Sequence, residues 1–155
     1  MRKMFRHRSH LDVSAEALCR FHLLPDALEV LQPPWEKVKV VSRSGAVDQP
    51  GSRITLRVSI GPFAQTWVAE HSAYEPGRMF RDTMVSGPFP FWEHTHLFEP
   101  DGPNASWLED RVEYELPLGW FGHAAAGWYV NRRLRRLFEY RHRVTIETLG
   151  KPKTT

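Results

Sequence analysis

The sequence has a single cysteine, Cys19, and no apolar stretch near the ~18 residues that a membrane span needs. One cysteine excludes an intramolecular disulfide and agrees with a reducing compartment. The basic N-terminus, residues 1–8, has no apolar run behind it, which argues against a signal peptide. Glycine-rich phosphate loops, nucleophile elbows, kinase signatures and Cys/His zinc spacings are also missing. We therefore expect a soluble, cytoplasmic protein without those chemistries.

What is present is typical of a globular domain. Of the 155 residues, 41% are hydrophobic, 25% are charged and 12% are aromatic. This composition excludes a disordered, collagen-like or coiled-coil chain. A chain of this length buries about 70% of the surface that its unfolded form exposes, enough for one core. We predict one domain over residues 1–149, followed by a mobile polar tail at 150–155.

Charge is unevenly distributed along the chain, although Lys and Arg exceed Asp and Glu by only 21 to 18. The first ten residues hold four basic residues and no acidic one, and residues 131–155 hold eight basic against two acidic residues. Basic ends could form a patch for nucleic acid or an anionic membrane. We favour pairing of the basic ends with the acidic middle of the chain, since surface charge alone is weak evidence for a partner.

Apolar residues alternate with polar ones between regularly spaced turn signals. Glycine–proline pairs and similar signals recur roughly every 10–15 residues, which predicts a meander of antiparallel strands. Each strand should turn one face to the core and the other to water. The inward rows are Ile54, Leu56, Val58 and Ile60; Phe80, Asp82 and Met84; Trp92, His94, His96 and Phe98; and Leu108, Asp110, Val112, Tyr114 and Leu116.

Helices are predicted on both sides of this meander. Ser14 is a suitable N-cap for a short helix over residues 15–22. A second short helix over residues 26–31 should end before Pro33. A long amphipathic helix is predicted from about 120 to about 149. The expected order is one strand, two short helices, six strands and a long helix, which makes the fold class α+β.

A curved antiparallel sheet and one long helix enclose a wedge between them. If side chains leave this wedge unfilled, it becomes an apolar pocket for a small ligand. The long helix begins with small residues at 124–127 (AAAG). They either leave room for a ligand or only permit close packing of helix and sheet, and both interpretations stay open at this point.

Six short motifs occur along the chain: LQPPW at 31–35, FRD at 80–82, GPF at 87–89, WEHTHLF at 92–98, DRVEY at 110–114 and FEYR at 138–141. As an ordered set they resemble the SRPBCC superfamily, also called START or birch-pollen-allergen-like proteins. The resemblance extends from residue 5 to about 149 and is closest to a bacterial group of ligand-binding SRPBCC proteins. The superfamily includes polyketide cyclases/dehydrases, coenzyme-Q-binding proteins and lipid-transfer domains, so it does not choose between binding and catalysis.

The resemblance implies a helix-grip fold, in which a strongly curved seven-stranded antiparallel sheet wraps around the long C-terminal helix. Two short helices would follow the first strand, and the first strand would lie between the second and the seventh. Arg6 and Arg8 would then lie beside Glu113 and Glu115 and form cross-strand ion pairs.

Polar side chains interrupt the inward rows of the predicted strands. If those rows face the pocket, His94, His96 and Asp110 converge there together with Asp82. They should then hydrogen-bond to each other or to a ligand, because burying them unpaired is costly. We favour a structural role for Asp–His pairs, and acid–base catalysis of cyclase or dehydratase type is the alternative.

A metal held by His94, His96 and one aspartate is geometrically feasible, because residues two apart on a strand point the same way. It is the least favoured of the three interpretations. The sequence thus predicts neither a metal nor a cofactor.

Further candidates for the pocket wall are aromatic side chains and one more histidine. The expected ligand-binding residues are Trp67, Phe80, Asp82, Trp92, His94, His96, Asp110, Tyr114, His123 and Trp128. The catalytic candidates among them are His94, His96, Asp82 and Asp110, and Trp35 is a further wall candidate. His7, His10, His71 and His142 carry no motif and are expected at the surface or with local partners. Cys19 is expected to be a small buried hydrophobe.

These features predict a protein that binds, transports or sequesters a small hydrophobic or amphipathic molecule, such as a lipid, a quinone or a polyketide-like compound. The alternative is a cyclase or dehydratase that uses the Asp/His groups of the same cavity. An interaction module that uses the basic ends ranks last, and we expect no nucleic-acid partner. The chain could be a monomer or a homodimer.

Overall fold

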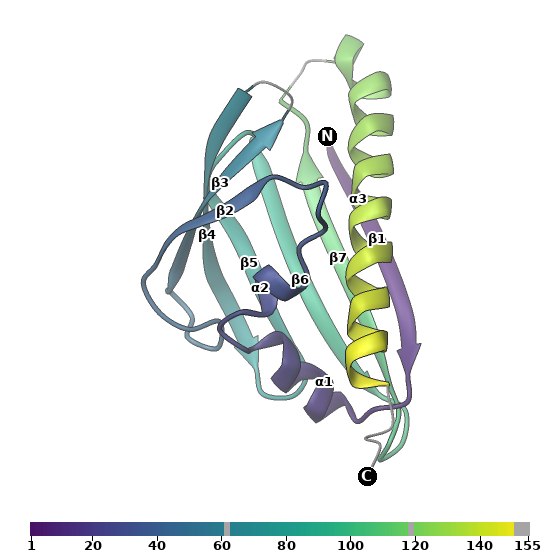
Figure 1. Ribbon diagram of the computed structural model, residues 1–155. Helices are drawn as coiled ribbons and strands as arrows, with labels where there is room; N and C mark the ends of the chain where they lie inside the picture. Colours follow the sequence, from purple (N-terminus) through teal and green to yellow (C-terminus); the bar gives the residue numbers. More distant parts are fainter. Residues whose placement is uncertain (61–62, 118–119, 151–155) are drawn as a thin grey trace.

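The computed structural model describes residues 1–60, 63–117 and 120–150; the side chains of residues 60 and 120–124, and residues 151–155 of the predicted tail, lie outside this description. The element order is the expected one (Figure 1). The helices are α1 (Ala15–His22), α2 (Ala27–Val30) and α3 (Trp120–Leu149). The strands are β1 (Arg2–Leu11), β2 (Val38–Arg43), β3 (Arg53–Ile60), β4 (Phe63–Glu75), β5 (Met79–Ser86), β6 (Phe91–Pro100) and β7 (Ser106–Glu115).

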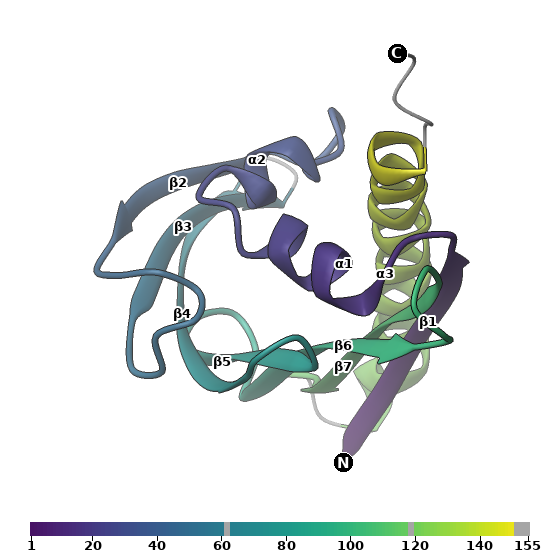
Figure 2. The ribbon, with the colours of Figure 1, turned by 90° about the horizontal axis from the view of Figure 1, so that it is seen from below.

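The seven strands form one curled antiparallel sheet in the order β1-β7-β6-β5-β4-β3-β2, which confirms the helix-grip fold. The expected place of β1 between β2 and β7 is wrong. β1 pairs along its length with β7, and β2 pairs with β3 at the opposite edge of the sheet. The two edges stay apart because α1 and α3 lie between them (Figure 2).

Helix α1 forms where its capping residue predicts it. Ser14 Oγ accepts a hydrogen bond from the backbone N–H of Ala17 at 3.2 Å. Leu18 and Cys19 on its inner face are buried in a core cluster that also contains Phe98 of β6. Cys19 is therefore a small buried hydrophobe, as expected.

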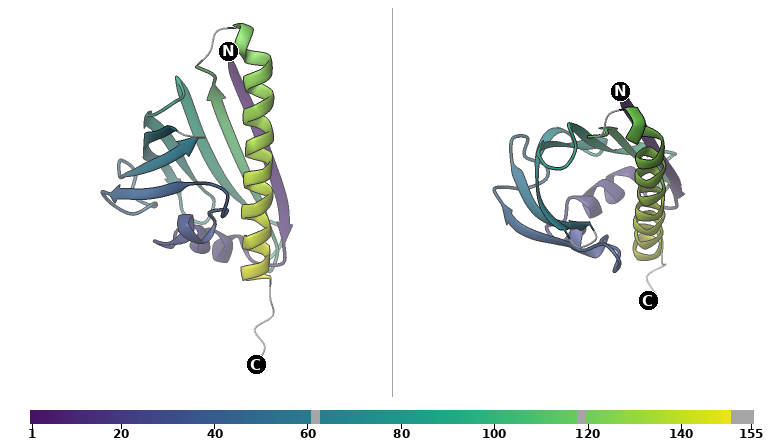
Figure 3. Two further views of the ribbon diagram at one scale, coloured as in Figure 1. Left: turned by 45° about the horizontal axis from the view of Figure 1, so that its top comes forward. Right: turned by 90° about the horizontal axis from the view of Figure 1, so that it is seen from above.

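Helix α3 runs along the β1–β7 side of the sheet (Figure 3). The ring of Phe138 stacks on Phe5 of β1 with ring centroids 5.5 Å apart, and Leu134 completes this contact. Gly127 also faces β1, but an added Cβ atom would come too close only to the flexible end of the Lys3 side chain, which can move aside. The packing of helix and sheet therefore does not require glycine at this position. None of the helices in the described chain has the length and hydropathy that a bilayer span requires.

On the outer face of the sheet, basic residues of β1 form ion pairs with acidic residues of other strands, but the partners are not the expected ones. Arg8 Nη2 donates a hydrogen bond to Glu99 Oε2 at 2.7 Å. Arg6 lies opposite another arginine of β7. The predicted pairs of Arg6 and Arg8 with Glu113 and Glu115 are therefore wrong, because the register of β1 against β7 differs from the one assumed.

Candidate functional site

A cavity of about 550 Å³ lies between the concave face of the sheet, α3 and the segment that carries α1 and α2. Most of its wall is apolar. The inward row of β3, which includes Leu56, forms one side, and Leu31 and Leu137 contribute from the helical segments. The volume falls in the range of about 300–1,000 Å³ that is usual for small-molecule sites.

Three aromatic rings form one end of the cavity. Trp67 of β4 and Trp92 of β6 meet edge to face with ring centroids 5.0 Å apart. Phe89, from the turn between β5 and β6, packs on Trp92 at 4.9 Å. This corner offers a large apolar contact area to a ligand.

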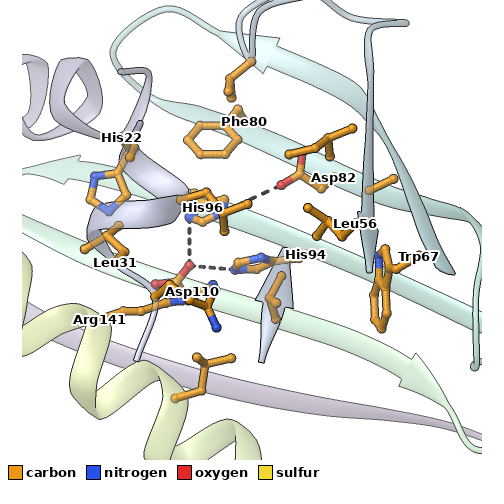
Figure 4. Close-up of a pocket in the computed structure, with 18 of the residues that line it drawn as sticks. His22, Leu31, Leu56, Trp67, Phe80, Asp82, His94, His96, Asp110 and Arg141 are labelled. Carbon is orange, nitrogen blue, oxygen red and sulfur yellow. Dashed lines mark hydrogen bonds and ion pairs between the residues drawn. The ribbon is translucent and has the colours of Figure 1, made fainter. Parts of the chain in front are cut away.

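A second part of the wall is polar and centres on Asp110 of β7 (Figure 4). His94 Nε2 donates a hydrogen bond to Asp110 Oδ1 at 2.7 Å, and His142 Nε2 of α3 donates to Oδ2 at 2.7 Å. His96 Nδ1 lies 2.9 Å from Asp110 Oδ1, but off the direction that a hydrogen bond needs. This buried nitrogen has no hydrogen-bond partner among the described residues.

Asp82 of β5 lies on the other side of His96 (Figure 4). His71 Nδ1 of β4 donates a short hydrogen bond to Asp82 Oδ1. The second oxygen, Oδ2, lies 3.9 Å from His96 Nε2. Two carboxylates therefore approach the two ring nitrogens of one imidazole.

Both carboxylates are held in the ionised form. Burial alone would raise the pKa of Asp110, but the charge of His96 and the hydrogen bonds from neighbouring imidazoles lower that pKa well below its usual value. Burial also acts to raise the pKa of Asp82, and the hydrogen bond from His71 together with His96 lowers it on balance. An ionised carboxylate only accepts hydrogen bonds, so the ring nitrogens bonded to it carry the protons.

At least two of the imidazoles are neutral near pH 7. Burial, reinforced by His96, lowers the pKa of His94 to about 4, against the opposing hydrogen bond to Asp110. Burial and His96 likewise lower the pKa of His22 of α1 to about 4. Because Nε2 of His94 carries the proton towards Asp110, its Nδ1 keeps a free lone pair. Such a nitrogen can accept a proton or bind a metal.

Arginines of α3 complete the wall. Arg141 extends towards Asp110 (Figure 4), and burial lowers the pKa of its guanidinium while Asp110 opposes that effect. Arg141 Nε is buried and lacks a hydrogen-bond partner within the part of the chain that is described. At the rim, Arg133 Nε donates to Glu36 Oε1 at 3.0 Å and so joins α3 to the segment before β2.

The structure brings most of the predicted site residues to this cavity, namely Trp67, Phe80, Asp82, Trp92, His94, His96 and Asp110. Tyr114 does not line it, because Phe89 and Trp92 pack on its ring and leave it 1% exposed in a core cluster. Trp128 is 65% exposed and lies with Trp35 in an outer groove on the surface of α3. The side chain of His123 lies outside the described residues.

Sequence reasoning missed cavity histidines that have no motif. His71 and His142 are 7% and 2% exposed, so the expectation of surface positions is wrong, as is that of purely local partners. His71 continues the alternation of Trp67 and Ala69 on β4, and all three line the cavity. His142 follows Phe138 by one helical turn. Extending these two periodic rows would have found both histidines.

One group in the cluster has the composition of a metal site. Asp82, His94 and His96 each offer a ligand atom, and these atoms lie within 4.8 Å of one another. The carboxylate oxygen and imidazole nitrogens are ligand types that several divalent transition metals accept.

Similarity to known proteins agrees with this architecture. The family described as polyketide cyclase / dehydrase and lipid transport matches residues 12–143. Among solved structures, a protein of Thermus thermophilus superposes with a TM-score of 0.70 at 18% identity, covering 95% of this chain and 99% of that one. A START superfamily protein from Mycobacterium smegmatis gives 0.68 at 18% identity, with 94% and 98% covered.

The Zhui aromatase/cyclase from a Streptomyces strain, R1128, gives a TM-score of 0.61 at 12% identity, with 95% of this chain and 90% of that chain covered. At these identities the structural similarities show the fold alone. No protein with a curated description matches the sequence. Because the family match extends over most of the chain, the protein belongs to the family described as polyketide cyclase / dehydrase and lipid transport, and its fold is similar to that of a START superfamily protein.

Proposed function

We propose that the protein binds a small hydrophobic or amphipathic molecule in the cavity between the sheet and α3, for transport or sequestration. The observation that carries this proposal is a cavity of about 550 Å³ with apolar walls and one polar cluster. A ligand with an apolar body and a single polar end matches this division of the wall.

The apolar body would lie against Leu56, Trp67 and Trp92. Burying apolar ligand surface there contributes roughly 25 cal/mol per Å². The polar end would lie against the cluster, where 23% of the Asp82 side chain is exposed. Neutral His94 can accept a hydrogen bond from a ligand hydroxyl at Nδ1.

The test compares two tryptophan substitutions on adjacent residues of β3. Leu56→Trp fills the cavity, whereas Arg57→Trp places the same ring on the exposed opposite face. Native mass spectrometry of freshly purified protein should show a bound small molecule in the wild type and in Arg57→Trp, and little or none in Leu56→Trp. The fluorescent probe anilinonaphthalene sulfonate should bind the wild type and Arg57→Trp with similar affinity and Leu56→Trp more weakly.

Circular dichroism would establish that both variants are folded. If the wild type carries no small molecule and the probe binds equally well to both variants, the cavity is not a binding site and the proposal is wrong.

A second candidate function is catalysis of cyclase or dehydratase type in the same cavity, and the neutral His94 oriented by Asp110 favours it. A base in this position could take a proton from a carbon between two carbonyl groups. The same proton could then be returned to a departing hydroxyl group, which leaves as water. The aromatase/cyclase among the similar structures carries its chemistry on this fold.

Turnover of a poly-β-ketone substrate decides between the two functions. An enzyme should lose that turnover in His94→Gln and Asp110→Asn while the folded variants still bind the probe. A wild-type protein that binds the poly-β-ketone and returns it unchanged has the binding function alone.

A further inference from the structure

Asp82 Oδ2 and His96 Nε2 face each other across 3.9 Å at the polar wall of the cavity. The opposite nitrogen, Nδ1, lies 2.9 Å from Asp110 Oδ1 and has no hydrogen-bond partner among the described residues. The separation of Asp82 Oδ2 from His96 Nε2 is too long for a hydrogen bond. A carboxylate oxygen and an imidazole nitrogen are both ligand types that a transition-metal ion accepts.

His94 supplies a third candidate ligand. Its Nε2 is hydrogen-bonded to Asp110, so Nδ1 is the nitrogen that remains to bind an ion. One ligand atom from each of Asp82, His94 and His96 lies within 4.8 Å of the others. Bonds of about 2.0–2.1 Å in a tetrahedral site place ligand atoms about 3.4 Å apart, so side-chain rotations close the remaining gap.

Two of these three side chains are also held by a further partner. Asp110 binds His94 Nε2 and lies beside the unpartnered Nδ1 of His96. His71 binds the other oxygen of Asp82. Metal-binding histidines commonly donate their second N–H to a carboxylate, and metal-binding carboxylates are themselves hydrogen-bonded.

The charge of the cluster favours a cation. Asp82 and Asp110 supply two negative charges, and Arg141 supplies one positive charge from α3. The other charged side chains of the cavity wall, among the described residues, form ion pairs at its rim. Glu36 pairs with Arg133, and Arg43 pairs with Glu29, which does not line the cavity. The two carboxylates therefore outnumber the single arginine of this part of the wall, which suits a bound cation.

We propose that Asp82, His94 and His96 bind a divalent first-row transition-metal ion such as Zn²⁺, with Asp110 and His71 as positioning residues. Three protein ligands leave at least one coordination position open, as in metal sites that bind water or a substrate. That position faces the cavity and would take an oxygen atom of the bound molecule. This last contact rests on the proposed function, whereas the ion site rests on the protein's own residues.

The test uses full-length, tag-free protein treated with EDTA and titrated with Co²⁺, followed by visible d–d absorption. We expect one Co²⁺ per chain, absorption typical of four or five ligands, and displacement by Zn²⁺. His94→Ala, His96→Ala and Asp82→Asn should each weaken binding at least about tenfold. His10→Ala is the matched control, because His10 lies on the outer surface beside Asp101 and should leave affinity unchanged.

Substitution of a positioning residue should affect Co²⁺ binding differently from substitution of a ligand. Asp110→Asn should weaken Co²⁺ binding by about 10–100-fold while the absorption spectrum of the saturated site keeps its shape. If ligand variants prove unstable, the wild type still decides the question, because an ion that binds the folded state raises the melting temperature with its concentration. Zn²⁺ should raise it in the wild type and His10→Ala alike, and Mg²⁺ should not.

The inference is overturned if Co²⁺ shows no saturable binding at one per chain, or if folded ligand variants bind it as tightly as the wild type. It is also overturned if nitrogen NMR of the wild type with excess Zn²⁺ shows His96 doubly protonated between the two carboxylates. Anilinonaphthalene sulfonate binding by the EDTA-treated protein separates the two proposals. Probe binding without Co²⁺ binding contradicts the ion site alone, and Co²⁺ binding without probe or ligand binding contradicts the proposed function alone.

Discussion

His142 of α3 donates a hydrogen bond through Nε2 to Oδ2 of Asp110 at 2.7 Å and so ties the long helix to the sheet. Its other nitrogen, Nδ1, accepts a hydrogen bond from Ser9 Oγ of β1 at 2.8 Å. Both partners of the first bond are buried. The helix, the edge strand and the polar wall of the cavity therefore share one buried network.

Replacing His142 by Leu should destabilise the fold, because Oδ2 of the ionised Asp110 loses its donor inside the protein. We expect the free energy of unfolding to fall by about 3 kcal/mol, measured by urea denaturation. His10→Ala removes a histidine–aspartate bond at the exposed surface and should cost less than about 1 kcal/mol. Equal losses in the two variants would show that the buried network does not hold the helix.

Local signals were sufficient to predict most of the fold. Ser14 marked the start of α1, and the alternation around His94 and His96 placed both side chains on the concave face. These features depend on neighbouring residues, so they can be read along the chain. The Asp110 row was placed correctly for the same reason.

Features that depend on distant parts of the chain were not predictable in this way. The separation of β1 from β2 depends on where α1 and α3 pack, and the partner of Arg8 depends on the register of β1 against β7. His142 meets Asp110 across a sequence separation of 32 residues. Whether Tyr114 lines a cavity or fills a core depends on which distant side chains pack on its ring, and no local pattern specifies that.

The pH dependence of stability should report the buried neutral histidines. The pKa values of His22 and His94 are lowered to about 4, against about 6.5 in an unfolded chain. Between these values the unfolded chain binds protons that the folded chain does not, so stability decreases as pH falls from about 6.5 to about 4. Each histidine contributes up to about 1.4 kcal/mol per pH unit, measured by urea denaturation at several pH values.

Below this window the aspartates add to the loss, because the lowered pKa of Asp110 gives stability that disappears as pH falls through that pKa. His22→Leu should make the curve between pH 6.5 and 4 less steep than that of the wild type. Stability that is constant from pH 7 to 4.5 would contradict burial of neutral histidines.

Substitutions on two faces of α3 test how the helix packs. Phe138→Ala removes a buried ring that stacks on Phe5, and we expect a loss of about 3 kcal/mol in the free energy of unfolding. Trp128→Ala removes an exposed ring of the same helix and should change stability by no more than about 0.5 kcal/mol. A larger loss for Trp128→Ala than for Phe138→Ala would mean that the helix is rotated about its axis.

The ion pair between Glu36 and Arg133 crosses the rim of the cavity and separates it from the outer groove on α3. Glu36→Gln weakens this connection, so the probe should enter and leave the cavity several-fold faster in stopped-flow fluorescence. The number of probe molecules bound at saturation should not change, because the wall itself is intact. Glu16→Gln breaks the exposed Glu16–Arg20 pair on α1 and serves as the control with unchanged rates. Unchanged rates in Glu36→Gln would mean that the probe enters elsewhere, and reduced capacity would mean that Glu36 supports the cavity wall itself.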